Sequence, residues 1–298
     1  MSVIDCINVT KRYGRETALE NLTFSIEKNK ITGIIGRNGA GKTTTLKILA
    51  GYIQESSGDV KVFSEHPFNS LMVSANTIFV DDQMNLPSSL NLAEILNNAE
   101  MFYENWDCEL AERLFSYFSF HPKQTHDQLS KGKKSTFNMI IGLASRCALT
   151  IFDEPTTGMD AAVRSDFYRA LLKDYLAHPR TILLSSHHLN EIEELLEDIL
   201  LLKDGQVYLH MSLMELKELA VGLTGKKDEI QKWISNKEVY YESRVGINDN
   251  YVVVENTFTK EELAKLTATG ITISQVASND LCVYLTNTSK GGIDDVFK

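Results

Sequence analysis

A glycine-rich stretch at residues 36–43, Gly-Arg-Asn-Gly-Ala-Gly-Lys-Thr, carries the residue types that bind phosphate groups. It fits the pattern G-x-x-x-x-G-K-[ST], in which glycines let the backbone curl so that successive N–H groups point at a polyphosphate. Lys42 supplies a cation for the terminal phosphates, and the Thr43 hydroxyl is a natural ligand for Mg²⁺. We therefore expect the chain to bind a nucleoside triphosphate. The expected contacts are Gly36, Asn38, Gly39, Ala40, Gly41, Lys42, Thr43 and Thr44.

The segments on either side of this loop favour a real phosphate site over a glycine-rich turn that binds nothing. Residues 31–35 are apolar and β-branched, which predicts a buried strand. Residues 44–50 place Leu46, Ile48 and Leu49 at helical spacing. The N-terminus of such a helix adds a partial positive charge beside the phosphates.

Two consecutive carboxylates end another apolar segment, residues 148–154. Acids at the end of a buried strand are costly unless they are paired or used. Asp153 is suited to hold Mg²⁺ through water. Glu154 is expected to point to the other side of the strand, where it is free to polarise a water molecule.

Two more predicted strands end in polar residues. The strand at 77–80 is followed by Asp81-Asp82-Gln83, and the strand at 181–185 by Ser186-His187-His188. Open α/β sheets present such residues to ligands at the carboxyl ends of their strands. We therefore expect the three strand ends to face one crevice.

Weaker signals lie outside these strands. Residues 3–10 and 22–26 predict strands joined by a turn at Gly14, and the nearby Tyr13 either packs or stacks on a purine ring. Three- and four-residue apolar spacing over 84–128 predicts a helical insert, and a further helix is expected from about 135 to 147. The turn Ser130-Lys131-Gly132 before that helix is either a cap or an anion site.

The composition limits the class of protein. The 298 residues allow one large domain or two ordinary ones, and 43% hydrophobic with 23% charged residues is typical of a soluble protein with a core. A formal net charge of −10 disfavours nucleic acid as the main partner. We expect neither a signal segment nor a membrane span. The four scattered cysteines suit reduced thiols in the cytoplasm rather than disulfides or zinc.

Taken in order, these motifs resemble the ATPase subunit of an ATP-binding-cassette (ABC) transporter, in the bacitracin-exporter-like or Ytr-type branch of Gram-positive bacteria. The resemblance covers roughly residues 3–215. It implies an α/β P-loop NTPase core with an antiparallel β subdomain and a helical subdomain at about 84–135, within an ATPase domain at 1–215.

Residues 216–298 lie outside the resemblance and predict a small C-terminal α+β appendage. Its expected elements are strands at 239–245, 251–254 and 281–285 and a helix near 260–266. A structural cap, dimerisation and regulation all remain open as its role.

The resemblance assigns roles residue by residue. It makes Tyr13 the ring that stacks on adenine, Asp153 the Walker B metal anchor and Glu154 the general base. Asp160 becomes the D-loop acid, and His187 the switch histidine at the γ-phosphate.

Two motifs depart from the family pattern. The usual signature L-S-G-G-Q is here Leu-Ser-Lys-Gly-Lys at 129–133, which keeps Ser130 and Gly132 to reach a partner's γ-phosphate. For the Q-loop residue at the metal, sequence register favours Asp82, while residue identity favours Gln83.

The resemblance also implies cofactors, partners and location. It makes the chain an ATP hydrolase that uses ATP and Mg²⁺ and pairs head to tail in a homodimer or heterodimer. The chain is expected on the cytoplasmic side, peripheral at the inner face of the membrane. There it energises a permease on separate chains, whose helix docks on the helical insert.

The transported cargo and the wider function leave alternatives. Export of amphipathic peptides or antibiotics is the first hypothesis. Uptake of a small solute such as acetoin and a non-transport regulatory ATPase are the alternatives. A DNA-repair ATPase is disfavoured because no sustained heptads interrupt residues 44–128. A ribosome-associated protein is disfavoured because there is a single phosphate loop.

Overall fold

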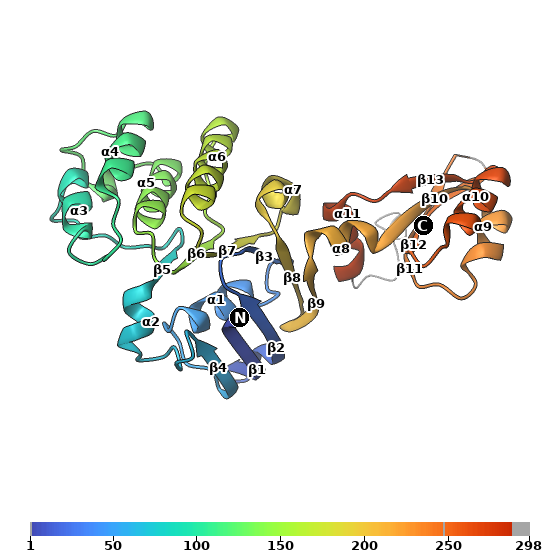
Figure 1. Cartoon of the computed structure of the whole chain (residues 1–298), viewed down its shortest axis with the longest axis horizontal. Coiled ribbons are helices and arrows are strands. Elements are labelled where there is room, and N and C mark those ends of the chain that lie inside the picture. The colour runs from blue at the N-terminus through green and yellow to red at the C-terminus, as the bar shows by residue number, and fades with distance from the viewer. Residues whose placement is uncertain (1, 247, 288–298) are drawn as a thin grey trace. The chain divides into compact units, whose positions relative to one another are not determined.

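The computed structural model describes residues 2–246 and 248–287. The chain divides into two compact units, residues 1–210 and 211–298 (Figure 1). None of the helices in these described residues has the length and apolar character needed to span a bilayer.

The first unit is built on a six-stranded sheet in the order β5-β6-β7-β3-β8-β9. Neighbouring strands from β5 to β8 run parallel, which brings their carboxyl ends to one edge of the sheet. Every residue of β3, β6 and β7 is buried, as expected for strands covered on both faces. The strands are β5 (Thr77–Val80), β6 (Leu149–Asp153), β7 (Thr181–Ser186), β3 (Ile31–Ile35), β8 (Asp198–Lys203) and β9 (Gln206–Ser212).

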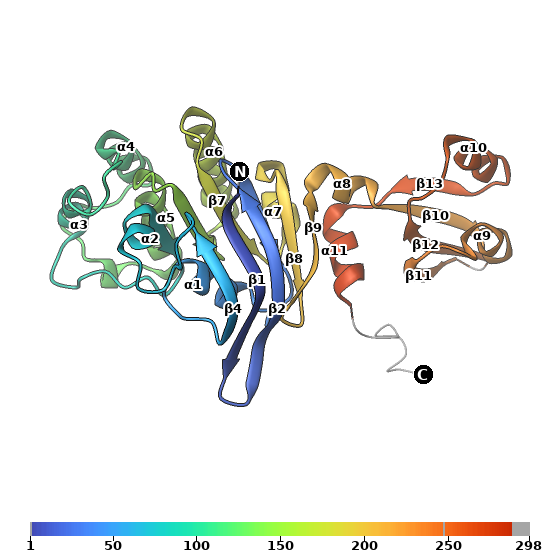
Figure 2. The ribbon, with the colours of Figure 1, turned by 60° about the horizontal axis from the view of Figure 1, so that its bottom comes forward.

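A second, antiparallel sheet in this unit has the order β2-β1-β4, with β1 at Ser2–Tyr13, β2 at Glu16–Glu27 and β4 at Ser57–Val62. The three strands lie side by side in Figure 2. Their buried residues share one hydrophobic core with the phosphate-loop helix α1 (Lys42–Leu49) and the central sheet. This arrangement confirms the predicted antiparallel β part of the fold.

Helices α3 to α6 lie on the side of the central sheet away from the β2-β1-β4 sheet (Figure 1). Helix α4 packs on α5, and α5 packs on α6. Helix α5 begins at Lys131, four residues before the predicted start, because the Ser130 hydroxyl accepts a hydrogen bond from the Lys133 N–H and caps it. The helices of this unit are α2 (Leu71–Asn76), α3 (Leu92–Ala99), α4 (Cys108–Tyr117), α5 (Lys131–Ala144), α6 (Ala161–Ala177) and α7 (Leu189–Ile192), with 3₁₀ turns at His126–Gln128 and Glu193–Leu195.

The second unit is an α+β sandwich with one antiparallel sheet in the order β11-β12-β10-β13. Its chain order β-α-β-β-α-β with this strand order is the ferredoxin-like arrangement. One sheet face packs on helices α9 and α10 through a core that includes Val221, Val252 and Leu266. The elements are α8 (Leu213–Glu218), β10 (Ala220–Lys226), α9 (Lys227–Ile234), β11 (Val239–Val245), β12 (Asp249–Glu255), α10 (Lys260–Ala268), β13 (Thr272–Gln275) and α11 (Ser278–Thr286).

The predicted strand at 281–285 is wrong, because this segment lies in helix α11. Its β-branched and aromatic residues favoured a strand, but the burial follows a helical period. Leu281, Cys282 and Leu285 are buried, whereas Val283 is 53% exposed. Packing of one helical face therefore overrides the local strand preference.

An ionic network with a buried centre and partly buried outer members fastens the helical insert to the central sheet. The Arg146 guanidinium contacts Asp107, the N-cap of α4, at 2.6 Å, and Asp174 of α6 at 3.0 Å. Arg180, next to the first residue of β7, contacts Asp174 at 2.8 Å, and both side chains are 5% exposed. One carboxylate thus balances two arginines that belong to different parts of the unit.

Replacing Asp174 by Asn should therefore destabilise the first unit by about 3 kcal/mol, because it leaves two arginines without their shared counter-charge. Urea unfolding followed by circular dichroism measures the shift in midpoint. Glu109→Gln is the matched control, since its ion pair with Arg113 is exposed on both sides and should matter little. Equal midpoints for both variants would show that the network contributes no net stability.

Candidate functional site

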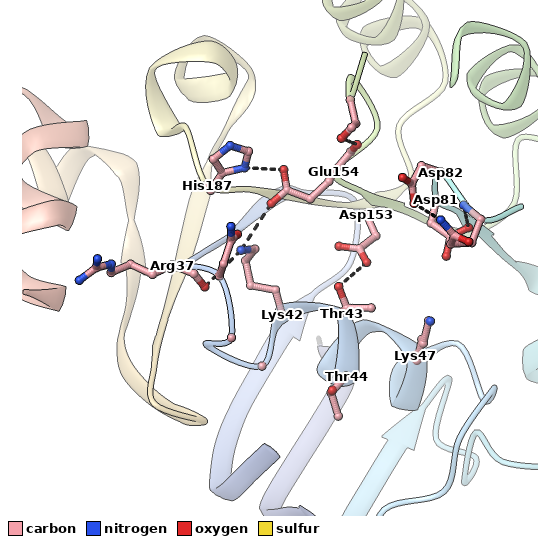
Figure 3. Close-up of a pocket in the computed structure, with 15 residues that line it drawn as sticks. Arg37, Lys42, Thr43, Thr44, Lys47, Asp81, Asp82, Asp153, Glu154 and His187 are labelled. Carbon is pink, nitrogen blue, oxygen red and sulfur yellow. Dashed lines mark hydrogen bonds and ion pairs between the residues drawn. The ribbon is translucent and has the colours of Figure 1, made fainter. Parts of the chain in front are cut away.

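The phosphate loop and three strand ends line an open cavity of about 420 Å³ in the first unit (Figure 3). Residues from β5, β6 and β7 meet here because those strands run parallel. The residues lining this nucleotide cavity are Arg37, Asn38, Gly39, Gly41, Lys42, Thr43, Thr44, Lys47, Asp81, Asp82, Gln83, Asp153, Glu154, Thr157 and His187.

The loop conformation depends on its glycines. Gly41 caps helix α1 with φ 100°, and a Cβ there would lie 2.4 Å from a Leu19 methyl group. Lys42 is buried, and its amine donates a hydrogen bond to the Gly36 carbonyl at 2.8 Å. Gly36 and Ala40, which were predicted as contacts, are not among the lining residues. They pack against each other and against strand β8 instead, where a Cβ on Gly36 would lie 2.6 Å from the Leu202 carbonyl oxygen.

Two of the predicted Mg²⁺ ligands, Thr43 and Asp153, lie together because the buried Asp153 carboxylate accepts hydrogen bonds from its neighbours. Asp153 is 6% exposed, and it accepts a hydrogen bond from the Thr43 hydroxyl at 2.6 Å. The Ser185 hydroxyl donates to its second oxygen. These donors satisfy both carboxylate oxygens, and the resulting oxygen cluster has the chemistry that Mg²⁺ prefers.

Glu154 lies in the same cavity as Asp153, which corrects the expectation that it points to the other side of the strand. Strand β6 ends at Asp153, and Glu154 turns into the left-handed region with φ 47°. Strand alternation therefore no longer applies to it. The Thr157 hydroxyl holds this turn by donating to the Glu154 carbonyl at 2.8 Å. Such strain in a non-glycine residue is typical of functional sites.

Two ionisable groups fix the Glu154 carboxylate. One oxygen lies 2.8 Å from the His187 Nδ1, and the other lies 3.4 Å from the Lys42 amine. Figure 3 shows the three side chains pointing toward one another, while Arg37 points away. A carboxylate held between an imidazole and the phosphate-loop lysine is placed to act on a water at a terminal phosphate.

Both Q-loop candidates line the cavity, so the geometry keeps the two alternatives open. The Gln83 amide donates to the Asp82 carboxylate at 3.1 Å. Partial burial acts to raise the pKa of Asp82, but hydrogen bonds from Gln83 and Lys131 outweigh it and lower that pKa. Burial raises the pKa of the neighbouring Asp81. Asp82 is therefore more readily ionised than Asp81.

Other predicted residues lie outside the nucleotide cavity. Tyr13 ends β1, is 48% exposed and has the Lys11 amine 5.1 Å from its ring centre. Ser130 and Gly132 line a separate cavity of about 550 Å³ together with Asp160, the N-cap of α6. In a single chain Ser130 and Gly132 therefore do not line the phosphate loop's cavity.

Four contributors to the site were not predicted from the sequence, and the first is Arg37, whose carbonyl lies 3.5 Å from the Lys42 amine. Ser185 hydrogen-bonds Asp153, and its position at the end of a predicted strand was the available signal. Lys47, one helical turn beyond the loop, and Thr157, in the turn after β6, also line the cavity. Neither has a local sequence pattern that marks it.

The sequence model of the ABC transporter family matches residues 19–157, which hold the phosphate loop, the signature and both strand-end carboxylates. The chain carries an ABC transporter ATPase domain. The nucleotide of such a domain is ATP, and the family assignment makes this chain an ATP hydrolase. The motif order in the sequence had indicated the same family.

Individual relatives agree with this assignment. The ABC transporter ATP-binding protein YtrB of Bacillus subtilis is 29% identical over 220 residues, which are 72% of this chain and 74% of YtrB. The bacitracin transport ATP-binding protein BcrA of Bacillus licheniformis is 28% identical over 220 residues, 73% of this chain and 72% of BcrA.

Solved structures share the fold. The ATP-binding cassette MJ0796, solved as a dimer in a post-hydrolysis state with ADP and phosphate, superposes with a TM-score of 0.62. It is 23% identical, and the match covers 70% of this chain and 98% of that one. The P-loop NTPase fold predicted from the sequence is confirmed.

Replacing Lys42 by Ala should abolish tight ATP binding in this ABC ATPase. Hydrogen bonds to charged groups contribute about 1.5–3 kcal/mol, which corresponds to an affinity loss of about 10- to 150-fold. Calorimetric titration with Mg²⁺ and ATP measures the effect. Lys28→Ala is the control, because it removes an exposed cation that lies outside the nucleotide cavity. Retained affinity in the Lys42 variant would place the phosphates elsewhere.

Proposed function

We propose that this chain is the ATP-binding and ATP-hydrolysing subunit of a transporter whose permease is a separate chain. We further propose that the transporter exports amphipathic peptides or antibiotics. The observation that carries the proposal is the Glu154 carboxylate held between His187 and Lys42, beside the Thr43–Asp153 pair. This set of groups is suited to hydrolysing a bound triphosphate rather than only holding it.

Each side chain has a distinct task in the proposed reaction. Thr43 and Asp153 would hold Mg²⁺, with Gln83 or Asp82 as a further oxygen ligand; the ion supplies charge neutralisation at the phosphates. Lys42 and the loop N–H groups bind the β- and γ-phosphates, and Glu154 orients and deprotonates the attacking water. His187 fixes Glu154 and reaches toward the γ-phosphate.

Replacing Glu154 by Gln should slow hydrolysis by about 10²–10⁴-fold while leaving ATP binding intact, because the amide keeps the shape but accepts no proton. Phosphate release measures the rate, and calorimetry measures the affinity. Glu194→Gln, on an exposed residue outside the nucleotide cavity, is the matched control. Turnover within a few-fold of the parent would exclude Glu154 as the base.

A second chain is proposed to complete each site. Ser130 caps α5 and lines the signature cavity with Gly132, where the helix N-terminus leaves N–H donors for an anion. The open nucleotide cavity would leave one face of the γ-phosphate in water. Head-to-tail pairing, with the same or another ABC ATPase, would close it and exclude that water.

Mixing Ser130→Arg protein with Glu154→Gln protein should therefore restore activity that neither variant shows alone. In a head-to-tail homodimer one site of the mixed pair carries both lesions and the other carries neither. Phosphate release over a range of mixing ratios measures the effect, and each variant mixed with itself is the control. Failure to restore activity, together with a rate per chain that does not depend on concentration, would point to a site complete within the monomer or to a different partner ATPase.

A cavity of about 640 Å³ with several aromatic lining residues supports docking of a permease helix beside the helical insert. It is lined by Tyr52, Phe79 and Phe102, and Phe102 is 75% exposed. This groove shares Lys47, Asp81 and Gln83 with the nucleotide cavity, so the two sites have common walls. Such a contact would hold the chain at the inner face of the membrane.

The direction of transport rests on the relatives alone. BcrA is named for bacitracin transport, which favours a peptide antibiotic as the cargo. A second relative, SkfE of Bacillus subtilis, is named for peptide export, which favours export as the direction. Uptake of a small solute such as acetoin is the alternative, because the permease selects the cargo. Purifying the chain from membranes and testing what its co-purified permease binds would decide between them.

A further inference from the structure

An ion pair joins the signature helix to the loop at the nucleotide cavity within one chain. The Lys131 amine lies 3.1 Å from a carboxylate oxygen of Asp82. Lys131 is the first residue of α5, and Asp82 follows strand β5. Lys131 also stands where the common ABC signature has glycine, so this departure from the family pattern has a specific partner.

A second contact joins the same two segments. The Asn138 amide, 1% exposed, donates to the Asp81 carbonyl at 3.2 Å. The Asn138 side-chain oxygen lies 2.8 Å from Nε2 of the buried His126, which fixes the amide's orientation. Helix α5 therefore holds residues 81–82 at two points, one buried and neutral, the other ionic.

The ionic contact is the weaker and more easily broken of the two. Its side chains are 61% and 33% exposed, and pairs of this kind change an equilibrium by up to about fivefold. The first turn of α5 has no acidic residue, so Lys131 opposes the helix dipole without local compensation. Asp82 supplies that compensation only while it faces Lys131 and not the contents of the cavity.

We propose that the Lys131–Asp82 pair is a positioning contact that couples the nucleotide cavity of a chain to its own signature. The inference rests on the proposed function, in which Ser130 and Gly132 serve the partner's site. Asp82 lines the cavity, so a Mg²⁺ ion held there with ATP would compete with Lys131 for its carboxylate. Filling one site then releases or reorients the signature that completes the other, which makes the two sites cooperative.

The test uses dimers trapped by ATP in the Glu154→Gln protein. Analytical ultracentrifugation gives the dimer fraction against ATP concentration, and hence a Hill coefficient and a half-point. Position 131 is then changed to Arg, Met or Glu. The Arg variant should match the trapped parent. The Met variant should lower the Hill coefficient and shift the half-point by up to about fivefold, and the Glu variant should exceed both changes.

A NaCl titration and a substitution at a second lysine distinguish loss of the Lys131–Asp82 contact from loss of folded structure. Raising NaCl should move the trapped parent's curve toward that of the Met variant, whose own curve should move less. The salt dependence of the parent's own curve can be measured even if the variants at position 131 do not fold. Lys134→Met removes a charge from the same turn of α5 and should leave the Hill coefficient unchanged. Thermal midpoints taken alongside report any loss of structure.

Failure of the proposed function and failure of the Lys131–Asp82 coupling give different results. If the Glu154→Gln protein forms no ATP-dependent dimer, the proposed function fails and this inference fails with it. If it forms the dimer, and the Met and Glu variants follow its curve at every salt concentration, the pair positions nothing and only the inference is overturned.

Discussion

A buried carboxylate must accept hydrogen bonds, and the structure of the nucleotide cavity depends on the donors that surround Asp153. Asp153 is held by hydroxyls from Thr43 in the phosphate-loop helix and Ser185 in the neighbouring strand. Without them an ionised group at 6% exposure would be strongly destabilising. This constraint fixes α1 against β6 and β7. Ser185 also contacts the next residue, because its hydroxyl accepts a hydrogen bond from the Glu154 N–H at 2.8 Å.

Much of this site was predictable because its signals are local. The phosphate loop, the paired acids and the polar strand ends each lie within a few residues, and parallel strands bring such ends together. Two features were not predictable from local pattern. Glu154 leaves the strand alternation through a left-handed turn, and Lys47 reaches the cavity because α1 packs beside β6. The signature's position in a separate cavity depends on how α5 and α6 pack.

The fold shows the same division between local and tertiary causes. Strands β3, β5, β6 and β7 are largely apolar runs, and their predicted ranges fall within one residue of the observed ones. Strands β8 and β9 of the same sheet were not predicted. The segment at 281–285 has strand-forming residues, yet α11 forms because one helical face of it is buried. Its Tyr284 stacks on Tyr241 of β11 with ring centres 4.2 Å apart, a contact that no spacing rule reveals.

The first unit contains strong buried contacts and a weak exposed ion pair. The buried contacts fix the catalytic frame, whereas the exposed pair lies at the signature, which the proposal requires to move. Asp153 and Asp174 are buried, so breaking their contacts is costly, and these contacts hold the sheet, α1 and the helical insert in place. The Lys131–Asp82 pair is exposed and lies where the nucleotide cavity meets helix α5. Ligand binding can shift an equilibrium only by its differential affinity for two states, so the contact it switches has to be weak. A rigid catalytic frame that contacts the signature through a weak ionic pair, beside the buried Asn138 contact, meets both requirements.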